Sequence, residues 1–90
     1  MANSIKTTGM ASGTIQTSHK SGESVSKWVA RHNETVEHGT PGNTLTTIWP
    51  SATGTQTVTS NREELESNSD FTLRHEAAYM TQMEASPPVP

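Results

Sequence analysis

Residues 23–32 read ESVSKWVARH, and residues 66–75 read ESNSDFTLRH at an offset of 43 positions. Five positions are identical, and the aromatic Trp28 lies opposite the aromatic Phe71. Self-similarity at one fixed spacing is typical of chains built from a repeated unit. The pattern therefore predicts that an internal duplication organises the chain.

The duplication sets the predicted domain organisation. We expect residues 1–90 to form one small domain with two repeats, over about 3–40 and 43–84, and a flexible C-terminal tail over 85–90. Only 29% of the residues are hydrophobic, so a few large apolar side chains must supply most of the core. These side chains are Trp28, Trp49, Phe71, Tyr79, Leu45, Ile48, Leu65 and Leu73.

A helix is the clearest element of the first repeat. Its apolar face is formed at helical spacing by Val25, Trp28, Val29, His32 and Val36. We expect this helix over about residues 21–37, with Ser21 as its N-cap and Glu23 in its first turn. Gly39 and Pro41 supply the stop signal.

The matching stretch of the second repeat is ambiguous by itself, because apolar residues at alternate positions from Phe71 to Met83 also fit a strand. The repeat favours a helix over about residues 67–82, followed by a stop at Pro87 and Pro88. Its expected face consists of Phe71, His75, Ala78, Tyr79 and Met83.

β-branched residues and turn signals predict a hairpin before each helix. In the second repeat a strand over 43–49 ends at Pro50, and a second strand covers 56–60. In the first repeat a strand covers 13–19 by the same alternation, and a weaker counterpart covers 4–8. The expected order is β-β-α-β-β-α, an α+β fold in which two helices pack on one face of an antiparallel sheet. The other face would stay wet, in keeping with the row Thr55, Thr57 and Thr59.

Composition excludes several classes of partner. The formal net charge is −3 and no run of Lys or Arg is present, so we expect no nucleic acid partner. The absence of cysteine excludes disulfides and thiolate zinc sites. No stretch approaches the roughly 20 apolar residues that span a bilayer, and no apolar run opens the sequence. We therefore expect no membrane association and a cytoplasmic location.

Motifs that carry chemistry are sparse. The run from His75 to Tyr79 falls one residue short of the zinc-hydrolase helix motif, which needs a second histidine where Tyr79 stands. The chain has neither a glycine-rich phosphate loop nor a nucleophile in a recognisable context. We expect no enzymatic activity, no metal and no cofactor.

The candidate binding residues are Arg31, His32, Arg74 and His75, because the repeat places both Arg-His pairs at matched positions. Each imidazole can be packed, with one nitrogen hydrogen-bonded to a strand, or the two can meet across the pseudo-axis as a ligand site or pH-sensitive contact. The arginines can form a shared anion clamp. If each is instead paired, the nearby carboxylates are Glu34, Glu66 and Glu76.

A sparse core and the lack of a catalytic motif favour a non-enzymatic interaction or structural module. An uncovered sheet face or edge invites a protein partner or a second copy of the chain, so we expect a homodimer. The alternative is a small-ligand, anion or metal-ion binding domain that uses the repeated Arg-His positions.

Overall fold

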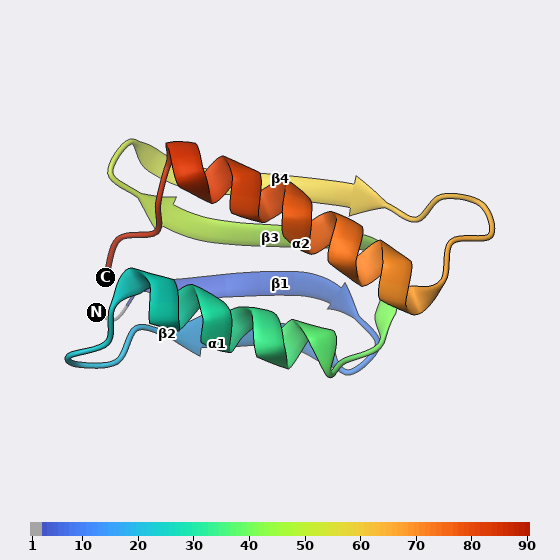
Figure 1. Ribbon diagram of the computed structural model, residues 1–90, viewed down its shortest axis with the longest axis horizontal. Coiled ribbons are helices and arrows are strands. Elements are labelled where there is room, and N and C mark those ends of the chain that lie inside the picture. Colours follow the sequence, from blue (N-terminus) through green and yellow to red (C-terminus); the bar gives the residue numbers. More distant parts are fainter. Residues whose placement is uncertain (1–2) are drawn as a thin grey trace.

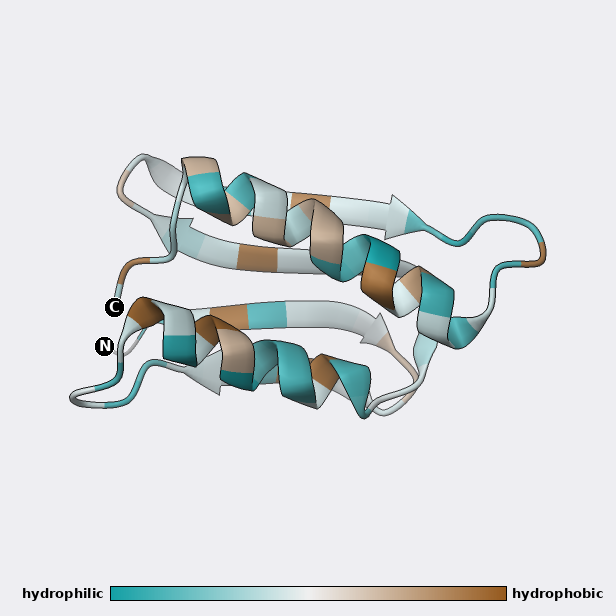
Figure 2. Ribbon diagram, viewed as in Figure 1, coloured by the Kyte–Doolittle hydropathy of each residue, from teal (hydrophilic) through white to brown (hydrophobic). Residues whose placement is uncertain are grey.

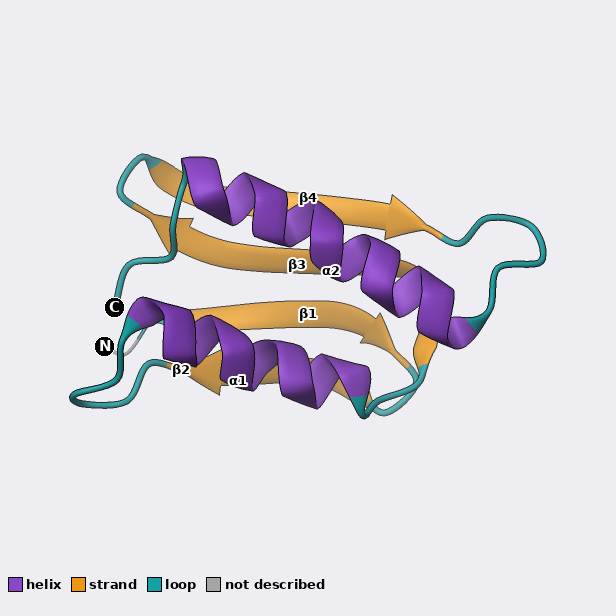
Figure 3. Cartoon of the chain, in the orientation of Figure 1, coloured by secondary structure: helices purple, strands orange, loops and turns teal. Residues whose placement is uncertain are grey.

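The computed structural model describes residues 3–90. Its elements, in chain order, are β1 (Ser4–Met10), β2 (Gly13–Ser18), α1 (Val25–Glu37), β3 (Pro41–Ser51), β4 (Gly54–Asn61) and α2 (Asn68–Ala85). The strands form one sheet in the order β2-β1-β3-β4, and all neighbours are antiparallel (Figure 3). Both helices lie on the same face of this sheet (Figure 1). The predicted α+β class and the order β-β-α-β-β-α are confirmed.

The sheet has one buried face and one open face, because successive side chains of a strand point to opposite sides. On β3, Leu45, Thr47 and Trp49 are fully buried beneath the helices. The exposed row on β4 consists of Thr55, Thr57 and Thr59. The expectation of a wet, threonine-rich face is therefore confirmed.

Two apolar clusters form the core, and a polar belt separates them. One cluster consists of Ile5, Trp28, Val29, Trp49, Tyr79 and Met83. The other consists of Met10, Val36, Leu45 and Phe71. The belt crosses each central strand at a buried threonine, Thr7 on β1 and Thr47 on β3. Figure 2 shows how few strongly apolar segments the four strands carry.

Both helices begin at a serine, but α1 starts later than expected. Ser24, not Ser21, is its N-cap, and its hydroxyl accepts a hydrogen bond from the Lys27 backbone N–H at 3.1 Å. Glu23 therefore lies ahead of the helix and not in its first turn. Ser67 caps α2 in the same way, accepting from the Asp70 N–H at 3.1 Å.

The predicted core list is partly wrong. The side chain of Leu65 is 99% exposed and that of Leu73 is 51% exposed. Leu65 lies in the loop before α2, and Leu73 lies on the outer side of that helix. Ile48 is only half-buried, because it faces the open side of β3 between two inward-facing neighbours. On α2, Ala78 is exposed and Thr72 is buried, which shifts the predicted face.

Pro50 does not end β3, which continues through Ser51 and pairs Pro50 with Thr55. The reason is the direction of the missing N–H. The Pro50 carbonyl accepts from the Val89 N–H at 3.0 Å, on the side away from β4. Because the N and C=O of one strand residue point to the same side, the proline removes no hydrogen bond from the β3–β4 ladder.

The first hairpin is less regular than the second. β1 extends to Met10, beyond the predicted end at Thr8, and its register shifts between Thr7 and Met10 against both neighbours. Gly9 has φ +96°, and a Cβ there would lie 1.9 Å from the Thr44 carbonyl oxygen. Only glycine fits this bulge. β3 and β4, by contrast, keep one register over eight consecutive pairs.

The segment after α2, for which the sequence predicts a flexible tail, lies against the end of β3. Ser51 and Pro88 form an isolated bridge, and the Trp49 indole donates to the Ser86 carbonyl at 2.8 Å. The Asn3 amide donates to the Val89 carbonyl at 3.0 Å, so the two ends of the chain lie side by side (Figure 1).

No helix within residues 3–90 has the length and apolar character needed to cross a membrane.

Candidate functional site

The two predicted histidines meet in the polar belt, through hydroxyl groups of the sheet. Both imidazoles are fully buried. One chain of hydrogen bonds passes through Thr17, His32, Thr7, Thr47, His75 and Ser60, in that order. Its five donor–acceptor distances are 2.9, 2.8, 2.7, 2.9 and 2.8 Å. The chain crosses the whole sheet, from edge strand β2 to edge strand β4.

Counting protons along this chain fixes the relation between the two tautomers. If both imidazoles accepted at Nε2, Thr7 and Thr47 would have no proton left for the bond between them. If both donated at Nε2, one threonine proton would be left in the centre of the core without an acceptor. Only opposite tautomers give both the Thr7 and the Thr47 hydroxyl a donor and an acceptor. The one spare hydroxyl proton then lies at an outer end of the hydrogen-bond chain. One histidine therefore carries its proton on Nε2 and the other on Nδ1.

Both imidazoles are neutral near neutral pH. Burial lowers the pKa of His32 to about 4, and the neighbouring charge of Arg31 lowers it further. Burial likewise lowers the pKa of His75 to about 4, with a smaller contribution from Arg74. The sequence predicts one strand partner for each ring, whereas each ring has two, one at each nitrogen.

This arrangement leaves neither histidine free to hold a ligand. Both nitrogens of each ring are engaged, and the rings are enclosed by the core. Within residues 3–90 no group of three or more His, Cys, Asp or Glu side chains is placed to bind a metal. Thr7 and Thr47 complete the chain and were missed by sequence reasoning, although their buried side follows from strand alternation.

The two predicted arginines lie in separate ion pairs. Arg31 donates through Nε and Nη2 to the Glu23 carboxylate at 2.9 and 2.8 Å, and through Nη2 to the Ser18 carbonyl at 2.6 Å. These bonds tie the middle of α1 to the end of β2 and to the loop between the two elements. The hydrogen bond from Arg31 lowers the pKa of Glu23 to about 2.

The second β-β-α unit has the same arrangement. Arg74 donates to the Glu66 carboxylate at 2.8 Å from both Nε and Nη2, and to the Asn61 carbonyl at 2.6 Å. The pKa of Glu66 falls to about 2, mainly through the hydrogen bond from Arg74. Of the predicted partners only Glu66 is used, and Glu23 was missed even though it matches Glu66 at the offset of 43 positions. With each guanidinium bound to a carboxylate, the geometry does not favour a shared anion clamp.

Tyr79 joins the two helices above the polar belt. Its hydroxyl donates to the Asn33 side-chain oxygen of α1. Its ring packs edge-on against both imidazoles, with centroid separations of 6.5 Å to His32 and 5.4 Å to His75. Tyr79, predicted only as a core aromatic, therefore covers both histidines.

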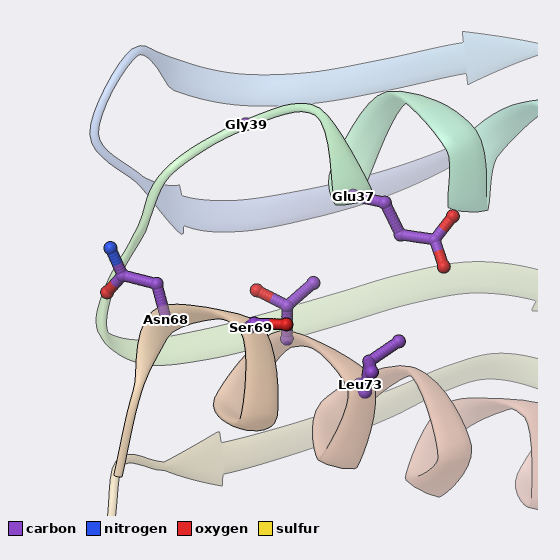
Figure 4. Close-up of a pocket in the computed structure, with 6 residues that line it drawn as sticks. Glu37, Gly39, Asn68, Ser69 and Leu73 are labelled. Atoms are coloured by element: carbon purple, nitrogen blue, oxygen red, sulfur yellow. The ribbon is translucent and has the colours of Figure 1, made fainter. Parts of the chain in front are cut away.

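A second feature of the seam between α1 and α2 escaped the sequence analysis. One carboxylate oxygen of Glu76, Oε2, is buried and accepts no hydrogen bond from a donor within residues 3–90. Burial raises the pKa of Glu76 to about 7, and the charge of Glu37 on α1 and a hydrogen bond shared with that carboxyl raise it further. Figure 4 shows Glu37 at the end of α1, beside a hollow of about 340 Å³ that Asn68, Ser69, Thr72 and Leu73 of α2 also line.

The remaining candidate is the open edge of the sheet at β4. Among the described strands, β4 has β3 as its single neighbour, and it forms the upper border of the sheet in Figure 1. Its sequence, GTQTVTSN, contains no proline and no charged residue. Natural edge strands are usually protected by charges, prolines, bulges or short length, and β4 has none of these features.

In comparisons with known proteins, no family model, no curated protein and no solved structure matches this chain.

Proposed function

We propose that the chain is a non-enzymatic interaction module that forms a homodimer by pairing β4 with β4 of a second copy. The observation that carries this proposal is the unprotected β4 edge. It offers eight residues in one uninterrupted register, so its outward N–H and C=O groups form a regular row. An antiparallel pairing of two such edges gives a twofold, self-complementary interface.

The other edge of the sheet is a weaker template. β2 has six residues, and its partner strand β1 carries the bulge at Gly9. A bulge twists the neighbouring ladder and interrupts the regular spacing that a further strand needs. The difference between the edges supports β4 as the pairing strand.

The distribution of charge supports a contact along the sheet. All nine acidic residues lie outside the four strands, whose single charged side chain is Lys6. Two copies with a net charge of −3 repel each other as wholes, but the strand edges carry no acid that would face its own copy. Extended threonine rows across the joined sheets would be neutral.

The same proposal accounts for the candidate sites of the sequence analysis. The Arg-His pairs serve the fold, because the histidines close the core and the arginines tie each helix to a strand. A catalytic role has no supporting group among them. The cytoplasmic location stays a prediction from the sequence.

We further infer that the two β-β-α units arose by duplication. The offset of 43 positions that relates the sequences also relates their contacts. Both serine N-caps, both Glu–Arg pairs and both bonds from a helix histidine to an edge-strand hydroxyl recur at this spacing. Recurrent hydrogen bonds support common descent more strongly than five identities do.

The test of self-association compares two matched lysine substitutions by size-exclusion chromatography with light scattering over a range of concentrations. Thr57→Lys places a charge on the open side of β4, where it faces its own copy across the twofold axis and should dissociate the dimer. Thr14→Lys, at the corresponding exposed position of β2, should leave the dimer intact.

Two results would overturn the proposal. A wild-type chain that stays monomeric at every concentration would refute self-association. Dissociation by the Thr14 substitution and not by the Thr57 substitution would refute the choice of edge. Circular dichroism of both variants establishes that each remains folded, which the exposure of both threonines leads us to expect.

A further inference from the structure

The Glu37 and Glu76 carboxyls lie within hydrogen-bonding reach of each other at the seam between α1 and α2, and neither has a cationic partner among residues 3–90. The ion pairs among residues 3–90 join Arg31 to Glu23 and Arg74 to Glu63 and Glu66. Two ionised carboxylates at this seam would repel each other, and the buried Oε2 of Glu76 would remain without a donor.

The repeat explains why Glu76 lacks a donor. At the offset of 43 positions, Asn33 corresponds to Glu76 and Val36 corresponds to Tyr79. Asn33 is satisfied because the Tyr79 hydroxyl donates to it across the seam. On the other side of the pseudo-axis the position of that tyrosine is taken by a valine, which has no hydroxyl. Glu76 must therefore find a proton elsewhere, and Glu37 is the group beside it.

We infer that Glu37 and Glu76 share one proton, which joins the C-terminal end of α1 to α2 and is released as the pH rises above neutral. In the protonated pair one carboxyl donates to the other carboxylate, so the seam is held by a charge-assisted hydrogen bond. Loss of the proton to solvent leaves two negative charges and a buried oxygen without a donor. The seam beside the hollow in Figure 4 then loosens.

The surroundings of the pair set the pH range over which this proton is bound and released. Burial and Glu37 together raise the pKa of Glu76 to about 7, above the ordinary value of 4.5. The charged pair acts in turn on Tyr79, whose pKa is raised by burial and by both carboxylates. The folded protein therefore binds one more proton than the unfolded chain between pH 4.5 and about 7. Stability from this pair is complete below pH 4.5 and is lost as the pH rises to about 7.

The experiment follows the thermal midpoint of the full chain from pH 4.5 to 8.5, for wild type, Glu76→Gln and Glu37→Gln. A glutamine amide supplies at every pH the donor that the shared proton supplies only below neutrality. We expect both variants to match wild type at the acidic end and to exceed it by several degrees above pH 7, for a domain of this size. The histidines contribute equally to the thermal midpoints of variant and wild type, so their contribution cancels in the difference between the two midpoints.

The matched control is Glu34→Gln, an exposed glutamate of α1, which should leave the difference independent of pH. Carbon NMR of the glutamate side chains gives a second readout that does not depend on stability. The shared proton predicts one carboxyl signal that titrates near neutrality in wild type. This titration should be absent from Glu76→Gln. Titration of all glutamates at or below their ordinary range, or equal pH profiles for the Glu76 and Glu34 variants, would overturn it.

Discussion

The two β-β-α units place an aromatic side chain at the same position and hold it in different ways. In the first unit the Trp28 indole N–H donates to the Thr17 carbonyl at 3.2 Å, and His19 packs edge-on against the ring with centroids 5.3 Å apart. In the second unit the Phe71 ring has no N–H group to donate. The Arg62 and Arg74 guanidinium groups lie over this ring at 4.9 and 5.4 Å from its centroid.

The polar surroundings of this core position therefore depend on which aromatic group occupies it. His19 and Arg62 are themselves related by the offset of 43 positions, so corresponding positions supply the polar neighbour in both units. An indole needs an acceptor for its N–H, whereas the face of a phenyl ring attracts a cation. The apolar site is conserved between the units, and its partners are exchanged.

The largest expected effect comes from removing these aromatics. Trp28→Ala and Phe71→Ala should each destabilise the domain by about 3–5 kcal/mol, because both side chains are fully buried. The tryptophan variant should lose more, since it also leaves the Thr17 carbonyl without its donor. Urea denaturation measures both, and Leu73→Ala is the matched control because that side chain is half exposed. Unchanged midpoints for both aromatic variants would show that neither ring supports the core.

The second largest effect is the loss of stability at acidic pH that the two buried histidines cause. Both units should show it. Both pKa values are lowered from 6.5 to about 4, so the unfolded chain binds protons first as the pH falls. The stability that each histidine contributes is complete above pH 6.5 and is lost as the pH falls to about 4. The loss should reach about 3 kcal/mol for each ring.

Nitrogen-resolved NMR of the imidazoles tests this prediction and the tautomers together. We expect both rings to stay neutral down to about pH 4, with opposite tautomers in any one molecule. A midpoint at or above 6.5 for either ring would contradict the buried, neutral state. Identical and fixed tautomers for both rings would contradict the single proton between Thr7 and Thr47.

The smallest expected effect concerns the loop that precedes each helix. Gly22 and Leu65 occupy corresponding positions, and both have left-handed backbones, with φ of 76° and 65°. Glycine adopts this conformation without strain, whereas leucine does not. Since Leu65 is 99% exposed, its side chain contributes no packing there.

Exchanging the two residues in turn should therefore move stability in opposite directions. Leu65→Gly is expected to stabilise the domain by up to about 1 kcal/mol, and Gly22→Leu to destabilise it by a similar amount. Thermal unfolding of the two single variants measures both shifts. A stabilising Gly22→Leu, or a destabilising Leu65→Gly, would show that a partner and not the loop backbone selects the residue at this position.

The helices and strands and their order could be predicted from local patterns in the sequence. Helical spacing around Trp28 and the similar stretch around Phe71 indicated both helices, and threonine-rich alternation indicated a sheet with one wet face. These signals are local, since they depend on side-chain periodicity and on turn residues within a few positions. The matched Arg-His positions were found for the same reason, because the offset of 43 positions is visible in the sequence alone.

Which side chains contact each other depends on how the elements pack, and this could not be predicted from the sequence. Nothing near His32 in the chain indicates that Thr7 and Thr47 join it to His75, because those contacts span 25, 40 and 28 residues. The helix seam was equally hidden: Glu76 looked like a partner for arginine, and its burial beside Glu37 depends on how two helices pack over one sheet. Hydrogen bonds and pKa values depend on distances between groups and on burial in the folded chain. Sequence patterns indicate such contacts only where the two residues are also close in the sequence.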